Sequence, residues 1–293
     1  MAKRHIRTRR PSATRLSATR RLSATRLSAT RGCNAPCSPG ATSRLDVARW
    51  LGAFGMVALF GGLAGQNAAG VAAPQRPGGG HEYRELTTTE GRLRYALLLP
   101  DDFDPSRTYP ALLAFPPGPQ TEPMVDAGFD RYWGPQASRR GWIVVSPAAP
   151  DGQIFHRGGD TLIPALLDQI ASEFQIEGGR FHVAGWSNGG RTAFHVALQH
   201  PSRVRSLVVI PGGPPTENDA DRLGQLEGIP VRMFAGGRDT EWVRVMQDTE
   251  QRLKALGVSV ETTVLPGEGH VPPSLDGERI MTLLEGLRAS GVG

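Results

Sequence analysis

The sequence VAGWSNGGRTA, from Val183 to Ala193, sets a serine among glycines where a short apolar run gives way to a helix-like stretch. Its central residues, 185–189, fit the pattern G-x-S-x-G. In that pattern the serine, here Ser187, stands on a sharp turn from a strand into a helix, and small neighbours are needed on steric grounds. The chain holds 37 glycines, so the pattern alone is weak evidence and also fits an ordinary turn serine.

Segments on both sides of this motif predict strands that alternate with helices. Apolar runs typical of strands lie at 92–100, 109–115, 142–146, 181–184, 206–210, 231–235 and 258–265. Helices are predicted at 124–140, 162–174, 192–199, 242–256 and 280–287. This alternation predicts an α/β fold, with a mostly parallel sheet wrapped by helices on both faces. Functional groups in such a sheet lie at the carboxyl ends of the strands.

Three loops at predicted strand ends carry reactive side chains. Ser187 follows the strand at 181–184, Asp239 follows the strand at 231–235, and His270 follows the last strand. A serine hydroxyl is a poor nucleophile until a base within hydrogen-bond reach takes its proton, and an acid must orient that base. We therefore expect Ser187 to be the nucleophile, Asp239 the acid and His270 the base of a catalytic triad.

Other residues compete for the roles of base and acid. The competing histidines are His156, His182, His195 and His200. A position inside a predicted strand or helix indicates packing for the second and third, and the fourth sits at a helix end, where it can cap carbonyl groups. The first lies in a loop that could line the site. Glu241 competes with Asp239, although a carboxylate near a helix N-terminus also has a structural explanation.

The three loop segments resemble those of a known superfamily. VAGWSNGGRTA, FAGGRDTEW and LPGEGHVPP are similar to the nucleophile, acid and histidine segments of α/β-hydrolases, and their order along the chain is the same. Upstream, YALLLPDDFDPSRTYPALLAF resembles secreted esterases of the feruloyl-esterase and polyhydroxybutyrate-depolymerase type. The resemblance covers about residues 84–290. It implies an α/β-hydrolase fold, hydrolysis of a small-molecule or polymeric carboxylic ester through an acyl-enzyme on Ser187, and no cofactor.

An oxyanion hole needs two backbone N–H groups, one of them from the residue after the nucleophile, here Asn188. The second is expected from the loop after the strand at 109–115. Many relatives place His-Gly in this loop, whereas this chain reads Pro116-Pro117-Gly118-Pro119-Gln120. Proline has no N–H, so the donor is Gly118 or Gln120, and we expect Gly118.

Two further expectations concern access to the site. The aromatic residues near strand ends are expected to line the substrate pocket, although core or rim positions explain them equally well; they are Trp133, Phe155, Trp186 and Trp242. Lids in this superfamily are commonly inserted before the strand that bears the acid. The segment at that place, residues 211–230, is long enough for a short surface helix but too short for a cap domain. The pocket should therefore open directly to solvent.

The N-terminal part of the chain differs in composition from the rest. Residues 1–46 form a basic leader with SATRL repeats, and residues 47–73 resemble a signal peptide or an N-terminal membrane anchor. Residues 74–83 are expected to be a linker, and residues 84–293 the hydrolase domain. We expect a secreted or periplasmic protein, or alternatively one held at the membrane by residues 50–73. The two cysteines, Cys33 and Cys37, both lie in the leader.

Charge distribution argues against a nucleic-acid partner. The overall net charge is +5, but residues 1–73 carry a net charge of +11, whereas residues 74–293 carry a net charge of −6. The sequence shows no cluster of metal ligands and no phosphate-binding loop. Two alternatives to an esterase stay open: a serine peptidase of the prolyl-oligopeptidase type and a non-catalytic binding module on the same fold.

Overall fold

The structure, a computed structural model, describes residues 80–290. The leader, the signal-like segment and most of the linker lie outside the described residues, so the predictions for them stay predictions. The strands are β1 Glu82–Thr88, β2 Gly91–Leu98, β3 Ala111–Phe115, β4 Ile143–Pro147, β5 Phe181–Trp186, β6 Val204–Ile210, β7 Val231–Gly236 and β8 Val260–Leu265. The helices are α1 Glu122–Gly128, α2 Gly134–Arg139, α3 Ile163–Glu173, α4 Asn188–Gln199, α5 Glu217–Asp221, α6 Thr240–Ala255 and α7 Gly277–Ser290.

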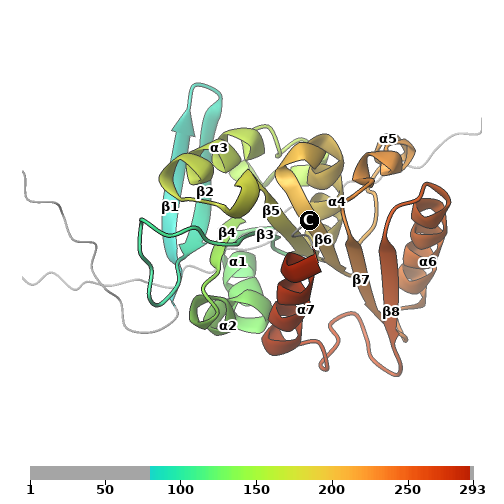
Figure 1. Cartoon of the computed structure of the whole chain (residues 1–293). Coiled ribbons are helices and arrows are strands. Elements are labelled where there is room, and N and C mark those ends of the chain that lie inside the picture. Colours follow the sequence, from blue (N-terminus) through green and yellow to red (C-terminus); the bar gives the residue numbers. More distant parts are fainter. Residues whose placement is uncertain (1–79, 291–293) are drawn as a thin grey trace, which may run out of the picture. The chain divides into compact units, whose positions relative to one another are not determined.

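All of these strands form one sheet in the order β1-β2-β4-β3-β5-β6-β7-β8 (Figure 1). The β1–β2 and β2–β4 pairs are antiparallel, and every later pair is parallel. Parallel neighbours joined by helices direct their carboxyl ends to one edge, so the loops after β3, β5, β7 and β8 meet there. The prediction of a mostly parallel sheet is confirmed.

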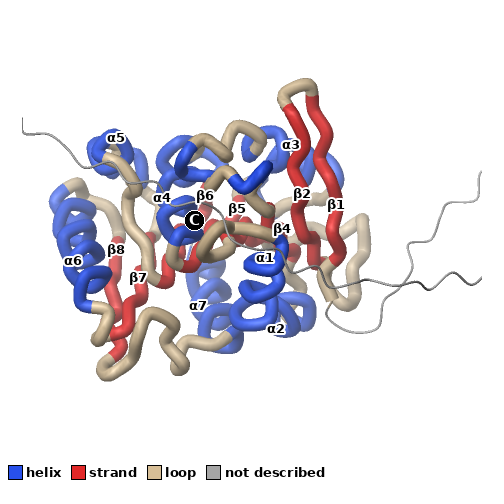
Figure 2. The backbone as a smooth tube through the Cα atoms, turned by 180° about the vertical axis from the view of Figure 1, so that it is seen from behind, coloured by secondary structure: helices blue, strands red, loops and turns tan. Residues whose placement is uncertain are grey.

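Helices cover both faces of the sheet. One buried cluster joins the inward residues of α3, α4 and α6 to one face, and a second joins those of α1, α2 and α7 to the other. Figures 1 and 2 show α1, α2 and α7 grouped together, apart from α3 and α4. The strands between these layers are apolar on both sides, and all five residues of β3 are buried.

The first strand, β1, was not predicted from the sequence. It reads EYRELTT and pairs along its whole length with β2, from Glu82 opposite Leu97 to Thr88 opposite Gly91. Leu86 is its one buried residue. A strand at the sheet edge forms through backbone pairing with its neighbour and needs no apolar alternation of its own. Its first two residues, Glu82 and Tyr83, fall within the segment expected as linker.

The single helix predicted at 124–140 is wrong. Three short segments occupy this stretch: α1, a π-helical turn at Phe129–Trp133, and α2. The break falls at Gly134, where a Cβ atom would lie 2.7 Å from the carbonyl oxygen of Phe129. Residue 135 is a proline, which has no N–H to continue a helical hydrogen-bond ladder.

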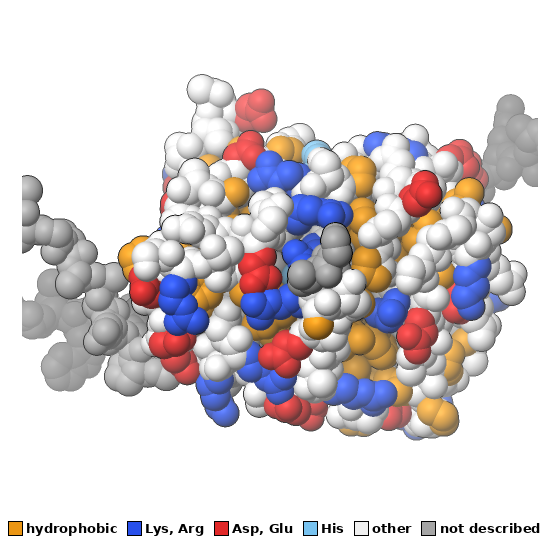
Figure 3. Space-filling model, in the orientation of Figure 1, with side chains coloured by type: hydrophobic (Ala, Val, Ile, Leu, Met, Phe, Trp, Pro, Cys, Tyr) orange, Lys and Arg blue, Asp and Glu red, His pale blue; other side chains and the backbone are white. Residues whose placement is uncertain are grey.

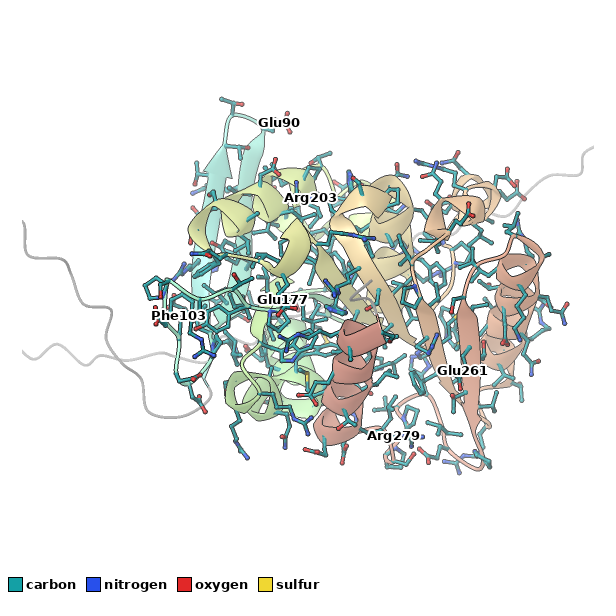
Figure 4. All side chains as sticks on the ribbon, viewed as in Figure 1. Glu90, Phe103, Glu177, Arg203, Glu261 and Arg279 are labelled. Carbon is teal, nitrogen blue, oxygen red and sulfur yellow. The ribbon has the colours of Figure 1, made fainter. Side chains whose placement is uncertain are left out.

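Ion pairs join surface elements in both helical layers. Arg203 pairs with Asp168 of α3 at 2.5 Å, and Arg288 of α7 pairs with Glu177; Figure 4 labels Arg203 and Glu177. Exposed pairs of this kind contribute little stability individually. Basic and acidic side chains are interspersed on the face shown in Figure 3. Within the described part, no helix is long and apolar enough to cross a membrane.

Candidate active site

Ser187 occupies the turn between β5 and α4 in a strained backbone conformation. Its φ and ψ are 59° and −116°, and a positive φ is uncommon for a residue with a side chain. Its N–H donates to the carbonyl oxygens of Ile210 and Pro211, each at 3.1 Å. Bonds to the end of the neighbouring strand hold the turn in place. The sequence motif thus forms the expected sharp turn at the carboxyl edge of the sheet.

The glycines of the motif have a direct steric cause. A Cβ atom on Gly185 would lie 2.0 Å from the carbonyl oxygen of Gly189, and a Cβ atom on Gly189 would lie 2.1 Å from that of Phe115. These distances are far below contact, and the atoms approached belong to the backbone. The small residues therefore let the nucleophile turn press against the end of β3.

Asp239, in the loop after β7, and His270, in the loop after β8, lie within hydrogen-bond reach of one another, and His270 also lies within reach of Ser187. The Nε2 atom of His270 lies 2.9 Å from the Ser187 hydroxyl oxygen, and its Nδ1 atom lies 2.5 Å from a carboxylate oxygen of Asp239. The Asp239 side chain is 18% exposed and that of His270 is 42% exposed. The three side chains form one hydrogen-bonded chain that ends at a solvent-accessible histidine.

Backbone contacts hold the acid loop and the histidine loop together. The N–H of Gly237 donates to the Leu265 carbonyl at 2.7 Å, and the N–H of Arg238 donates to the Glu268 carbonyl at 2.8 Å. A Cβ atom on Gly236 would lie 2.0 Å from the carbonyl oxygen of Gly269. The glycines of FAGGRDTEW and LPGEGHVPP therefore allow the two loops to pack backbone to backbone.

The loop after β3 lies against the start of α4. The Asn188 side chain donates from Nδ2 to the Gly118 carbonyl oxygen at 2.9 Å. Gly118 has a φ of 56°, a conformation that suits glycine. Within residues 80–290, the backbone N–H groups of Asn188 and Gly118 donate to no backbone carbonyl. The two amides expected to form an oxyanion hole are thus in touching loops and have no backbone acceptor.

Gln120 organises this loop through its side chain, a role that the sequence reasoning missed. The fully buried side chain donates from Nε2 to the Pro116 carbonyl at 3.2 Å and to the Thr192 hydroxyl at 3.1 Å. Its Oε1 atom accepts from the N–H of Phe155 at 3.0 Å. All of these partners except Pro116 are distant in sequence, so no local pattern marks the residue.

The structure contradicts the expected pocket position for two of the four aromatic residues. Trp133 and Phe155 are 1% and 0% exposed and belong to the two cores, so neither faces an open pocket. Trp186 is half-buried, with its ring edge-on to that of Tyr132. Trp242 is also half-buried, and its ring centroid lies 6.5 Å from that of His270. Of the four aromatic residues expected to line a pocket, Trp242 therefore lies close to the triad, and it also lines a cavity.

The competing histidines make other contacts. His182 bonds Ser206 at 2.7 Å, and burial lowers the pKa of its ring to about 3. His156 bonds Thr192 at 3.1 Å, and burial lowers its pKa to about 4. Burial also lowers the pKa of His200. These three rings are held neutral by their surroundings at neutral pH.

His195 lies between two carboxylates. Its Nδ1 atom is 2.9 Å from a carboxylate oxygen of Asp219, and its Nε2 atom is 3.1 Å from one of Asp160. These bonds join α4 to α5 and to the loop before α3. Among the residues that the structure describes, no group of three or more His, Cys, Asp or Glu side chains is arranged to hold a metal ion.

Comparison with known proteins finds partial matches to hydrolases. Residues 156–233 match the family described as alpha/beta hydrolase fold. Dipeptidyl-peptidase 5 of Porphyromonas gingivalis is 28% identical over 145 residues, 45% of this chain and 21% of that protein. A pimeloyl-[acyl-carrier protein] methyl ester esterase of Legionella pneumophila is 35% identical over 69 residues, 24% of this chain and 26% of that protein. The matches span about a quarter of the length of these curated relatives.

Solved structures agree on the fold. A ferulic acid esterase is similar with a TM-score of 0.56 and 18% identity, over 71% of this chain and 95% of that one. The matched segment and the solved structures agree with the predicted α/β-hydrolase fold of this chain. The similar proteins include both esterases and peptidases.

Proposed function

We propose that this protein is a serine hydrolase that cleaves carboxylic esters through an acyl-enzyme on Ser187. The observation that carries the proposal is the hydrogen-bonded chain from Ser187 through His270 to Asp239. A serine on a strained turn, an imidazole within 2.9 Å and a carboxylate behind that imidazole are the parts that nucleophilic acyl transfer requires.

Each residue has a step in this reaction. His270 accepts the proton of the Ser187 hydroxyl as its oxygen attacks the ester carbonyl, and Asp239 holds the imidazole in orientation. The negative charge on the carbonyl oxygen is stabilised by the N–H groups of Asn188 and Gly118. His270 then protonates the leaving alcohol, and a water molecule activated by the same histidine releases the acid and restores Ser187.

An ester substrate is supported by the comparisons and fits a site without a large cap between β6 and β7. The only structured elements between β6 and β7, within the described part, are α5 and a short turn at Leu223–Leu226. A methyl ester esterase and a ferulic acid esterase are among the similar proteins. The similarity to a dipeptidyl-peptidase makes peptide cleavage the second candidate.

A labelling experiment tests the proposal. A fluorophosphonate probe should attach to Ser187, located by peptide mass spectrometry, and Ser187→Ala should lose both labelling and turnover of 4-nitrophenyl acetate and methyl ferulate. The control is Ser172→Ala, because Ser172 is an exposed serine on α3 that bonds a carbonyl of its own helix. A dipeptidyl 4-nitroanilide is the peptide substrate.

The outcomes separate the candidate functions. Ester turnover that depends on Ser187, with slower turnover of the anilide, supports the esterase. Faster turnover of the anilide would favour the peptidase. An unlabelled Ser187 in folded protein would refute a catalytic role and favour a binding module. His270→Ala should behave as Ser187→Ala, and Asp239→Asn should cost the same or less, because Asp239 orients the base and does not attack.

A further inference from the structure

A cavity lies beside the triad, between the nucleophile helix and α6. Its volume is about 170 Å³, and its lining residues are Arg191, Gly213, Pro214, Glu241, Trp242 and Val245. The N–H of Arg191 donates to the Ser187 carbonyl at 3.1 Å, so Arg191 stands one helical turn from the nucleophile. The ring of Trp242 extends from the cavity toward His270, 6.5 Å between centroids. The cavity therefore lies close to Ser187, through Arg191, and close to His270, through Trp242.

Arg191 brings a positive charge without an ion-pair partner to this cavity, among the described residues. Among the described residues its guanidinium makes no ion pair and no hydrogen bond, and its contact is the face of Trp242, at 5.8 Å from the ring centroid. Arg140, by contrast, pairs with both Glu278 and Glu285, and Arg203 pairs with Asp168. Arg191 is half-buried, so water can accept hydrogen bonds from only some of its five N–H donors.

The walls of the cavity limit which groups can lie next to the Arg191 guanidinium. Gly213 forms part of the wall, and a Cβ atom there would lie 3.1 Å from a methyl group of Val245. The indole of Trp242 supports the planar guanidinium from one side, which leaves its edge for a planar partner. A guanidinium edge matches a carboxylate, because the two groups form two parallel hydrogen bonds.

We propose that Arg191 binds a carboxylate of the substrate, and that the preferred substrates are esters that carry a free carboxylate on their acyl or alcohol part. This proposal rests on the esterase function proposed above and names its substrate class. Arg191 takes no part in proton transfer or nucleophilic attack. It contributes to binding and orientation, which position the scissile carbonyl over Ser187.

Glu241 supplies the opposite charge in the same cavity. It is exposed, stands in the first turn of α6 and forms no ion pair with Arg191. A carboxylate there repels an anionic substrate and attracts a cationic one. Glu241 should therefore weaken the binding of the proposed carboxylate, and an ammonium group, such as the amino terminus of a peptide, would bind beside Glu241 and not beside Arg191.

The test compares pairs of esters that differ in one charge. The acyl-side pair is mono-4-nitrophenyl adipate and its methyl ester, and the alcohol-side pair is 4-butyryloxybenzoate and its methyl ester. The value of kcat/KM for the charged member divided by that for the neutral member is the readout. Its change on mutation cancels the intrinsic reactivity of each ester. Arg191→Gln should lower this ratio by about tenfold or more for at least one pair, as loss of charged hydrogen bonds does.

Matched variants complete the design. Arg191→Lys should restore part of the ratio, because the charge returns without the planar fork. Glu241→Gln should raise the ratio. Arg244→Gln is the control, because Arg244 is an exposed arginine on α6 that pairs with Asp248 and lies outside the cavity. It should leave the ratio unchanged.

The outcomes are decisive in either direction. A ratio that Arg191→Gln does not change in either pair would overturn the carboxylate proposal, even while Ser187-dependent ester turnover upholds the esterase function. A wild-type kcat/KM that is higher for amino-bearing esters than for the carboxylate esters, and that falls for the amino-bearing esters in Glu241→Gln, would assign the cavity to a cation and also overturn it. Loss of all ester turnover in the wild type would instead refute the proposed function itself.

Discussion

The side-chain amide of Gln120 donates to the hydroxyl of Thr192 at 3.1 Å and thereby ties the loop after β3 to the second turn of the nucleophile helix. The same amide holds the Pro116 carbonyl, two residues before Gly118. The buried side chain of Gln120, together with the Asn188 side chain that bonds the Gly118 carbonyl, thus fixes the proposed second oxyanion donor relative to Ser187.

Gln120→Ala should lower kcat for ester hydrolysis by about 10- to 100-fold, because an oxyanion donor is displaced. The folded protein should still react with a fluorophosphonate, although more slowly. Gln225→Ala, an exposed glutamine in the turn after α5, should leave kcat as in the wild type. Unchanged kcat in well-folded Gln120→Ala would show that the loop is held by other contacts.

Gly189→Ala should prevent normal folding. The added Cβ atom would meet the Phe115 carbonyl oxygen at 2.1 Å, so either β3 or α4 must move, at a cost of about 4 kcal/mol or more. Gly224→Ala is the matched control, because a Cβ atom there has nothing within 4 Å. Thermal unfolding of the two variants measures the difference, and equal melting temperatures would contradict the steric explanation.

His195 should stabilise the fold in a pH-dependent way. Burial alone would lower its pKa, but the hydrogen bonds and charges of Asp160 and Asp219 outweigh burial and raise that pKa above the ordinary 6.5. The stabilisation from a raised pKa is fully present below the unfolded value and is lost as pH rises through the folded value. The bond from His195 lowers the pKa of Asp160, so the contribution of Asp160 is lost at acidic pH.

His195→Gln should therefore reduce the free energy of unfolding most at mildly acidic pH, by about 3 kcal/mol, because it leaves a buried carboxylate without its charged partner. The loss should shrink in alkaline solution, where the wild-type ring has given up its proton. Urea unfolding of both proteins across this pH range is the measurement. A difference that is constant with pH would argue for a purely steric contribution of His195.

The site should work without activation at a lipid surface. The segment between β6 and β7 holds only α5 and a short turn, and Asp219 anchors α5 through His195 and Thr216. No large closing element is present between these two strands. Hydrolysis of 4-nitrophenyl butyrate should follow simple saturation across the solubility limit of the ester. A rate that rises sharply only above this limit, or a preference for long-chain triglyceride, would reveal a lid-like movement.

Much of the fold follows from local patterns in the sequence. Buried strands of a parallel sheet are apolar on both faces, so β3 to β7 stand out as short apolar runs. The turn at Ser187 has its own signature, since the close approach of β3 and α4 admits only glycine at Gly185 and Gly189. The loops with Asp239 and His270 were predicted from their place after strands, because parallel strands end at one edge.

The tertiary structure decided what depends on partners far away in the chain. The edge strand β1 exists through its pairing with β2, and Trp133 and Phe155 are core residues because helices close over them. Gln120 has a structural role because its side chain bonds Thr192 and Phe155. Arg191 is a candidate anion site because α6 places Trp242 against its guanidinium, while no described acidic residue forms an ion pair with it. Burial and pairing arise from packing between segments, so local periodicity carries no record of them. Local patterns in the sequence therefore specify the class of fold and the three reactive loops, whereas the packing of those loops sets which neighbouring side chains can act with them.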